Sequence, residues 1–292
     1  MNIVGIYRAS QFSPNMEDSD AAILNAVADR LRKSGHMVTC VHEEQLVRAD
    51  VSAADVVLSM GRLARTLDLL QEVEAEGVKV INTPLAVRHC ERKQFTQILM
   101  DEDVPFAPST ILSTINYQLP LKGAGGSFWL KKGEGYAEVA ADVVFVPNAE
   151  ELAEKIDDMR RRGISTLVVS EHLEGDLIKF YGVRGVPFFY WYDASEGHSK
   201  FGLEAINGPS HGYHFSEQQL YDICNHAATV MGLDIYGGDC VVNEDGKIQL
   251  IDINDWPSFS RCREQAAEMI TKLESLRSKA PLTFDRVPLT SK

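Results

Sequence analysis

Short apolar runs alternate with amphipathic segments through the first part of the chain. Runs that predict β-strands cover residues 2–7, 38–41, 56–60 and 78–81. Two segments between them carry apolar residues at helical spacing, namely Leu24, Val27, Ala28 and Leu31 in the first and Leu63, Leu67 and Leu70 in the second. Strands that alternate with helices are typical of a parallel, doubly wound sheet, so an α/β domain is predicted here.

The pattern changes at Asn82-Thr83-Pro84, which predicts a domain boundary between residues 1–83 and residues 84–292. Beyond it, apolar periodicity predicts helices over 85–101, 148–162, 216–230 and 258–276. Predicted strands cover 127–132, 143–146, 167–173, 177–183 and 187–192. The tail from Lys279 is polar, and we expect it to be loosely ordered.

The clearest local signal is a predicted β-hairpin near the C-terminus. Apolar runs at 235–242 and 248–253 flank the turn Asn243-Glu244-Asp245-Gly246. Asp-Gly between apolar runs is a strong hairpin signal, because glycine tolerates the positive φ that a tight turn needs. The turn folds the second strand back along the first.

This hairpin brings three oxygen-bearing side chains together. Asp252 and Asn254 are two positions apart on one strand and so point to the same face, and the turn brings Asp239 near them. Such ligands on a rigid sheet suit Mg²⁺ held on a nucleotide. Each residue alone is also a common turn former at a strand end, but the three together, followed by Pro257, favour the metal site.

Two predicted strands carry a lysine inside an apolar run. Lys131 lies in 127–132 and Lys179 lies in 177–183. Burying an unpaired ammonium group is costly, so such a lysine either extends to water or meets an anion. The chain has no G-x-x-x-x-G-K-[ST] and no G-x-G-x-x-G motif, which excludes two other kinds of nucleotide-binding loop.

The composition is that of an ordinary globular protein, because 45% of the 292 residues are hydrophobic and 24% are charged. The formal net charge of −13 argues against nucleic acid and anionic membranes as partners, since both need a basic surface. No apolar run is long enough for a signal peptide or a membrane span. Five cysteines without a C-x-x-C pair favour the reducing cytoplasm.

The order of these features resembles the ATP-grasp superfamily, which includes D-alanine–D-alanine ligase, glutathione synthetase and the ribosomal-protein glutamate ligases, and within it the branch of the last two. The resemblance rests on Asp239 followed by Asp252-x-Asn254, on Asn82-x-Pro84 before a helix, and on Lys131 in a strand. It implies a Rossmann-like N-terminal domain and an α+β ATP-grasp domain, whose two subdomains clasp the nucleotide and whose lid covers about 109–172.

The resemblance also implies ATP and Mg²⁺ as cofactors, with Mn²⁺ able to replace Mg²⁺. The metal ligands would be Asp239, Asp252 and Asn254. Many family members have Glu where this chain has Asp252, and both are hard oxygen ligands.

Further residues are expected to hold the nucleotide. They are Lys93, Lys131, Glu171, His172, Leu173, Asp176 and Lys179. The lysines would face the phosphates, residues 171–173 would form the hinge that reads adenine through its backbone, and Asp176, or Glu174 in its place, would bind the ribose. Lys93 is also consistent with an exposed helix lysine, and His172 with a packing role.

For the reaction centre the resemblance suggests three basic residues, Lys200, Arg184 and Arg261. Family members supply an arginine from the stretch that contains Lys200, and Arg184 is the competing candidate. Arg261 is predicted in the first turn of the helix over 258–276, where the helix N-terminus favours anions; a surface arginine is the alternative. The loop 133–136 would cover the phosphates, although it is short in glycine and carries an acid.

The implied activity is ATP-dependent carboxylate–amine ligation: a small-molecule or peptide carboxylate forms an acylphosphate, and an amine displaces phosphate. Two alternatives stay open, a small-molecule kinase like the ATP-grasp inositol phosphate kinases, which 252–257 also resembles, and a nucleotide-binding protein without turnover. Specificity is expected in the loops 8–15, 208–215 and 258–263. A homodimer is expected only because dimers are the commonest assembly.

Overall fold

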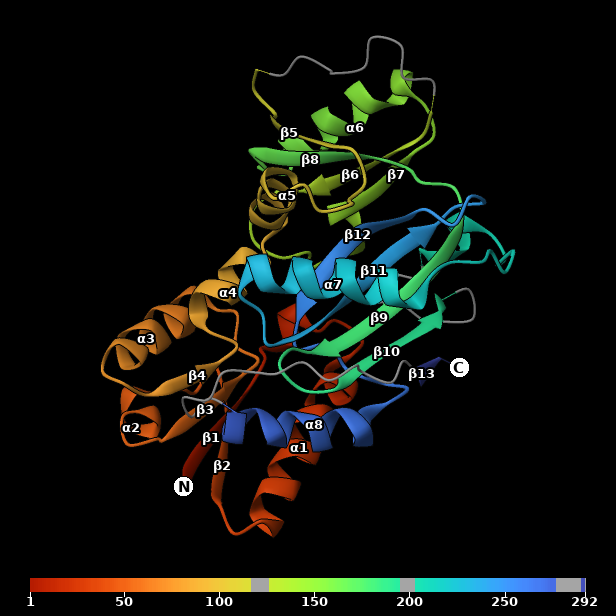
Figure 1. The fold of residues 1–292 in the computed structure, drawn as a ribbon. Coiled ribbons are helices and arrows are strands. Elements are labelled where there is room, and N and C mark those ends of the chain that lie inside the picture. Colours follow the sequence, from red (N-terminus) through yellow and green to blue (C-terminus); the bar gives the residue numbers. More distant parts are fainter. Residues whose placement is uncertain (117–125, 195–202, 277–289, 292) are drawn as a thin grey trace.

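The computed structural model describes residues 1–116, 126–194, 203–276 and 290–291. In these residues the chain forms three sheets, which follow one another from the bottom to the top of Figure 1. No helix in the described ranges is both long and apolar enough to cross a membrane.

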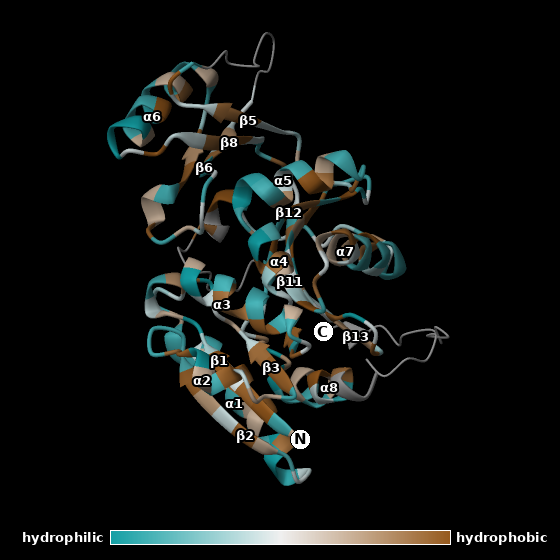
Figure 2. Cartoon of the chain, turned by 90° about the vertical axis from the view of Figure 1, so that its left-hand side faces the viewer, coloured by the Kyte–Doolittle hydropathy of each residue, from teal (hydrophilic) through white to brown (hydrophobic). Residues whose placement is uncertain are grey.

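The first sheet belongs to the N-terminal part of the chain. Its strands are β1 (Asn2–Tyr7), β2 (Met37–His42), β3 (Val56–Ser59) and β4 (Lys79–Ile81), in the order β2-β1-β3-β4 and all parallel. The helices are α1 (Glu17–Lys33), α2 (Arg48–Val51) and α3 (Ala64–Ala75). Ile3 packs in the core that contains α1, and Val4 packs in the core that contains α3. Helices therefore cover both faces, and the predicted α/β arrangement is confirmed (Figure 2).

The second sheet, at the top of Figure 1, is antiparallel. Its strands are β5 (Ser109–Ser113), β6 (Phe128–Lys132), β7 (Val143–Val146) and β8 (Thr166–Glu171), in the order β5-β8-β6-β7. Helix α6 (Ala149–Arg161) packs Leu152 and Ile156 into its core. The helix begins after Asn148, whose side chain accepts a hydrogen bond from the Glu151 amide, as an N-cap does.

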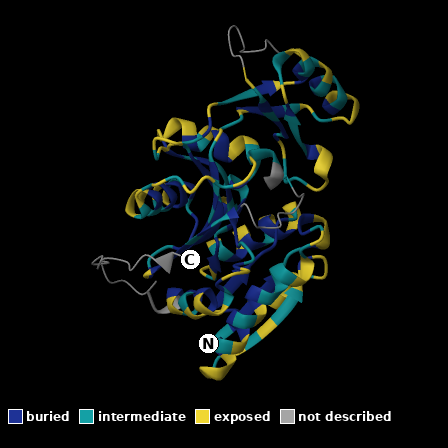
Figure 3. Cartoon of the chain, turned by 90° about the vertical axis from the view of Figure 1, so that its right-hand side faces the viewer, coloured by how far each residue is buried: buried dark blue, intermediate teal, exposed yellow. Residues whose placement is uncertain are grey.

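The central sheet contains the predicted hairpin. Its strands are β9 (Asp176–Val183), β10 (Phe188–Asp193), β11 (Ile235–Val242), β12 (Ile248–Asp255) and β13 (Thr290–Ser291), in the order β12-β11-β9-β10-β13. Phe180 faces the core of α7 (Glu217–Met231), and Tyr181 faces the core that α8 (Arg263–Leu276) shares with α1 and β1. Strands β9, β10 and β11 are largely buried (Figure 3). The first and central sheets thus share one core.

The connection between the first and second sheets is built by α4 (Pro84–His89) and α5 (Arg92–Asp101). Just before it, the Asn82 side chain donates to the Ile235 carbonyl at 2.7 Å and accepts from the amides of Asp234 and Ile235 at 2.8 and 2.9 Å. These bonds tie the end of the first sheet to β11. Short 3₁₀ turns occur at Ser10–Phe12, Ala140–Asp142 and Glu204–Asn207.

Two predicted helices have different bounds in the structure. The helix expected over 85–101 is two helices, because Glu91 has extended dihedral angles (φ −62°, ψ 137°) and begins α5 as its N-cap. The helix expected over 258–276 begins only at Arg263, because Phe259 has a φ of 48°, which an α-helix does not allow. Most of the tail after residue 276, which was expected to be loosely ordered, lies outside the described residues.

Candidate functional site

A cavity of about 370 Å³ lies where the three sheets meet. The connections of the first sheet line it with residues that include Arg8, Phe12, Asp20 and Arg62. The second sheet and the loop after β6 contribute Trp129, Lys131 and Tyr136, and the central sheet contributes Lys179, Asp239, Asp252 and Asn254. Eight of the residues singled out from the sequence line it: Lys131, Glu171, His172, Leu173, Lys179, Asp239, Asp252 and Asn254. The sequence signals therefore converge on one place.

The three expected metal ligands lie together on the hairpin. Asp239 of β11 is paired in register with Asp252 of β12, and side chains opposite one another on neighbouring strands are close enough to share one ion. The Asn254 amide nitrogen donates to Asp252 Oδ2 at 3.0 Å. Two carboxylates and an amide are the hard oxygen donors that Mg²⁺ prefers, so these residues fit the metal that the resemblance implies.

The local sequence explains why the two strands approach so closely here. Gly238 precedes Asp239, and a Cβ atom at Gly238 would lie 2.1 Å from the Asp252 carbonyl oxygen. The register then shifts between Asp239 and Cys240, as in a β-bulge. Bulges re-aim side chains beside functional sites, and the shift follows directly after the Asp239–Asp252 pair.

Three cations surround the two carboxylates. Lys179 Nζ lies 2.7 Å from Asp239 Oδ1, and Arg92 Nη1 lies 3.0 Å from Asp252 Oδ1. Burial opposes ionisation of Asp252, but Arg92 and Lys131 outweigh it and lower the pKa of this carboxyl group. Burial, reinforced by Arg92, lowers the pKa of Lys131 to about 7. The site therefore holds an ionised Asp252 beside a lysine that is poorly solvated and placed to receive an anion.

Replacing Lys131 by methionine is expected to stabilise the purified protein. Because the pKa of Lys131 is lowered to about 7, the unfolded chain binds more protons than the folded chain between pH 7 and about 10.4, so wild-type stability rises with pH across that window. We expect Lys131→Met to raise the free energy of unfolding at pH 6 by on the order of 1–3 kcal/mol, and the difference to vanish near the upper end of the window.

Urea unfolding across this pH range measures the effect. The matched control is Lys132→Met, because the neighbouring Lys132 side chain is 24% exposed and lies near Glu138, so a change below about 0.5 kcal/mol is expected. A loss of stability in Lys131→Met at pH 6 contradicts the prediction.

The expected hinge lies beside an aromatic cluster. The indole nitrogen of Trp129 donates to His172 Nδ1 at 3.1 Å, and the rings of Trp129 and His172 both lie near Phe145. Burial lowers the pKa of His172, which keeps Nδ1 available as an acceptor. The His172 amide donates to the Ser127 carbonyl at 2.9 Å, so this peptide is held by the second sheet. The His172 ring thus packs in this aromatic cluster, and His172 also lines the cavity.

The structure places Arg92, rather than Lys93, in the cavity. Lys93 is exposed and does not line it, although its amide bonds the Gly133 carbonyl at 2.8 Å. The break at Glu91 sets the rotation of α5, and the adjacent Arg92 turns toward Asp252. The sequence shows adjacent Arg and Lys residues near the start of a helix. Apolar periodicity did not fix the first residue of that helix, so it could not tell which of the two faces the cavity.

Asp176 and Arg184 lie outside the cavity lining. Asp176 is buried and accepts from the amides of His211 and Tyr213 at 2.6 and 2.7 Å, which fixes the loop after residue 207. Its alternative, Glu174, is exposed and does not line the cavity either. The Arg184 guanidinium group donates to the Asp234 carboxylate and to the Leu233 carbonyl, both at 2.8 Å.

The other two basic candidates are placed as follows. The Arg261 guanidinium lies 4.2 Å from the ring centroid of Tyr192, and Tyr192 lines the cavity while Arg261 does not. Arg261 lies before α8, and not in the first turn of that helix as was expected. Lys200 lies outside the described residues.

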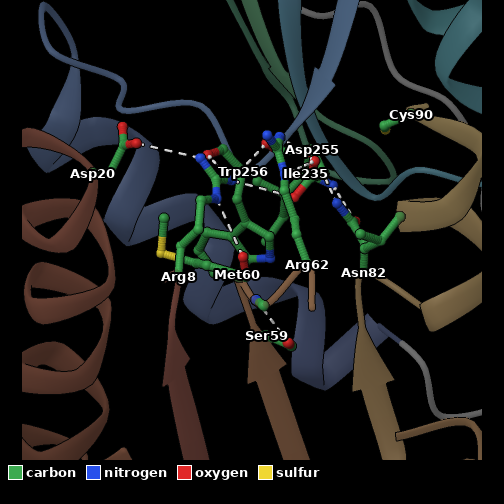
Figure 4. A network of polar contacts seen from close by, with 12 residues as sticks. Arg8, Asp20, Ser59, Met60, Arg62, Asn82, Cys90, Ile235, Asp255 and Trp256 are labelled. Atoms are coloured by element: carbon green, nitrogen blue, oxygen red, sulfur yellow. Dashed lines mark hydrogen bonds and ion pairs between the residues drawn. The ribbon is translucent and has the colours of Figure 1, made fainter. Parts of the chain in front are cut away.

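One feature of the cavity wall is absent from the sequence expectations. Figure 4 shows Arg8 and Arg62, from two loops of the first sheet, converging on Asp255 at the end of β12. Asp255 is fully buried, and Arg62 and Arg8 outweigh that burial and lower its pKa. Arg8 also donates to Asp20 and to the carbonyls of Met60 and Trp256. The loop 8–15 was expected to contribute to specificity, but its buried anchor was not identified.

Comparison with known proteins identifies the fold. No protein-family model and no curated protein sequence matches the chain. Among solved structures, the chain is similar to D-alanine–D-alanine ligase from Bacillus anthracis complexed with ATP, with a TM-score of 0.69 at 14% identity over 95% of this chain and 99% of that one. It is also similar to a D-cycloserine synthetase (TM-score 0.66, 16% identity, 95% and 100% coverage).

A third similar structure is a RimK-domain ATP-grasp protein from Sphaerobacter thermophilus, with a TM-score of 0.63 at 14% identity over 93% of this chain and 98% of that one. The matches extend over nearly the full length of each structure. The chain therefore has the ATP-grasp fold, and the fold that the resemblance predicted is confirmed.

Proposed function

We propose, from the premise that the chain has the ATP-grasp fold, that it is an ATP-dependent carboxylate–amine ligase that releases ADP. One observation carries the proposal: Asp239, Asp252 and Asn254 meet Arg92, Lys131 and Lys179 in a single cavity. Hard oxygen donors beside several cations suit a nucleotide triphosphate and its metal ion. Proteins of one fold can differ in activity, and these side chains are what suit this site to Mg-ATP.

The side chains have distinct roles in the proposed reaction. Asp239, Asp252 and Asn254 would hold Mg²⁺ or Mn²⁺, which would neutralise charge on the phosphates. Arg92, Lys131 and Lys179 would stabilise negative charge on the transferring phosphoryl group.

The protein itself needs no covalent nucleophile. A substrate carboxylate oxygen bonds to the γ-phosphorus as ADP leaves, and an amine nitrogen then bonds to the acyl carbon as phosphate leaves. The cavity walls position these reactants and limit the access of water.

The proposed function includes the substrates, the domains and the hinge that the resemblance implies. The substrates are a small-molecule or peptide carboxylate and an amine. Residues 1–83 form the first domain and 84–292 the ATP-grasp domain, with the second sheet, β5 to β8, as the lid. The hinge 171–173 would hold adenine.

A matched pair of variants tests where the nucleotide binds. Arg92→Met is expected to weaken binding of AMP-PNP with Mg²⁺ by about 10- to 100-fold, because it removes a charge-assisted contact in a poorly solvated cavity. Lys93→Met, one residue along the same helix and exposed, is expected to change affinity less than twofold. Calorimetric titration measures both, and an equal response of the two variants contradicts the placement.

The chemistry is tested by trapping. Candidate carboxylates are incubated with Mg-ATP and hydroxylamine but without an amine substrate. A ligase releases ADP and gives a hydroxamate, because hydroxylamine attacks the acylphosphate. A stable phosphorylated product without hydroxamate indicates a kinase, and nucleotide binding without ADP release under any condition indicates a binding protein; either result overturns the proposed ligase activity.

A further inference from the structure

Arg62 lies in the cavity wall with only one edge of its guanidinium group engaged. Its Nε atom donates to Asp255 Oδ1 at 3.0 Å, and its Nη2 atom donates to the same carboxylate oxygen. Among the residues that the structure describes, none accepts a hydrogen bond from Nη1. This nitrogen is also not among the fully buried polar atoms that lack a partner, so it keeps some exposed surface. Since the side chain is only 7% exposed and lines the cavity, its free edge faces the cavity.

Three other groups fix the direction of that edge. Arg62 Cζ lies over the Tyr136 ring, 4.4 Å from its centroid, and the Tyr136 hydroxyl donates to the Val87 carbonyl at 2.8 Å. Phe12 meets the edge of the Tyr136 ring at 5.5 Å between centroids. The buried Glu43 carboxylate accepts from the Arg62 amide at 2.8 Å. Arg62 is therefore held by its backbone, by one face and by one edge.

We propose that the free edge of Arg62 binds a carboxylate of a substrate that does not itself react. A guanidinium fork matches a planar carboxylate through two parallel hydrogen bonds. An arginine held in place by its surroundings loses little freedom on binding. This inference rests on the proposed ligase function, because it assigns part of the substrate for that site.

The charge balance of this wall favours a single negative charge. Arg8 and Arg62 contribute two positive charges, and Asp20, Asp255 and Glu43 contribute three negative charges, all within one hydrogen-bonded network. A monoanion added to a network without excess positive charge is opposed less than a dianion, because the fixed carboxylates repel every further charge. A carboxylate therefore suits the site better than a doubly charged phosphate.

The position of Arg62 indicates that the bound carboxylate is not the phosphorylated one. Its anchor, Asp255, directly follows Asn254 on β12, and successive side chains of a strand point to opposite faces. Arg62 is thus anchored to the opposite face of β12 from Asp252 and Asn254, while all of them line the same cavity. The group that it holds belongs either to a dicarboxylate substrate or to an amine substrate that is an amino acid.

The experiment follows the Nε–Hε signal of Arg62 in ¹⁵N-labelled full-length protein, assigned by its loss in Arg62→Lys. The probes are glutarate and its diamide, alanine and alaninamide, and methylphosphonate, each titrated with and without AMP-PNP and Mg²⁺. We expect glutarate or alanine to shift the signal to saturation and the matching amide to leave it in place. The affinity is expected to fall about tenfold or more in Arg62→Lys, because a point charge replaces a bidentate fork.

The matched control is Arg88→Lys, a partly exposed arginine outside the cavity lining that is paired with Asp68, which should leave probe binding unchanged. A shift with glutarate assigns the site to the carboxylate substrate, and a shift with alanine assigns it to the amine substrate; both support the proposal.

No shift with either carboxylate, equal binding of the amides, or a response only to methylphosphonate overturns it. The titration without nucleotide tests carboxylate binding at Arg62 and does not depend on the proposed ligase activity. A negative result there contradicts the carboxylate site, whereas a failure of AMP-PNP to bind contradicts the proposed function.

Discussion

Replacing Asp255 by alanine is expected to lower the free energy of unfolding by about 3–5 kcal/mol. The change leaves Arg62 without a carboxylate partner and removes one of the two carboxylates that pair with Arg8. The side chains of Arg62 and Arg8 are only 7% and 6% exposed. Removing one partner of a buried pair costs more than the pair itself contributes, because the remaining charge stays desolvated. Urea unfolding at neutral pH measures the loss.

The control for this prediction is Asp68→Ala, which breaks a pair between an exposed aspartate and an arginine that is 31% exposed and should cost less than about 1 kcal/mol. The pH dependence gives a second readout. Because Arg62 and Arg8 lower the pKa of Asp255, its contribution is present above the ordinary carboxyl pKa and is lost as the pH falls through the lowered value. A difference between wild type and Asp255→Asn that does not shrink in acid contradicts this account.

The hairpin was predictable because its signals are local. The apolar runs, the Asp-Gly turn and the spacing of Asp252 and Asn254 lie within a short stretch, and strand geometry converts spacing directly into a shared face. The same holds for Lys131, because a lysine inside an apolar strand is conspicuous wherever the strand packs. Both signals depend on backbone geometry that neighbouring residues determine.

The rotation of a helix is less predictable than its existence. Arg92 and Lys93 are adjacent, and periodicity over 85–101 does not reveal that the helix is interrupted before Glu91. One residue of error moves a side chain by about 100° around a helix. Similarly, the positive φ of Phe259 delays the start of α8 and separates Arg261 from its first turn.

Contacts between distant segments were beyond sequence reasoning. Arg8 and Asp255 are 247 positions apart, and Arg62 and Asp255 are 193 apart. No periodicity links such residues, and an acid after a strand is as common in turns as in ion pairs. The shared core of the first and central sheets brings these segments together, so the cavity wall is a product of tertiary packing.

Asp252→Asn is expected to lower carboxylate-dependent ADP release by about 10²- to 10³-fold. The substitution keeps the size of the side chain but removes the negative charge that would face the metal ion, and it leaves Arg92 beside a neutral amide. The charge on the transferring phosphoryl group then loses part of its stabilisation, since a cation held less firmly neutralises it less. The variant should retain the fold, because its β12 backbone pairing is unchanged.

The matched control for this prediction is Asp245→Asn, the same substitution at the exposed turn of the same hairpin, which should leave turnover within twofold of wild type. Binding of Mn²⁺ in the presence of AMP-PNP, followed by electron paramagnetic resonance, gives a readout that does not depend on the unidentified substrate. We expect Asp252→Asn to weaken it by about tenfold or more and Asp245→Asn to leave it unchanged. Equal Mn²⁺ affinity in both variants would show that Asp252 does not hold the metal.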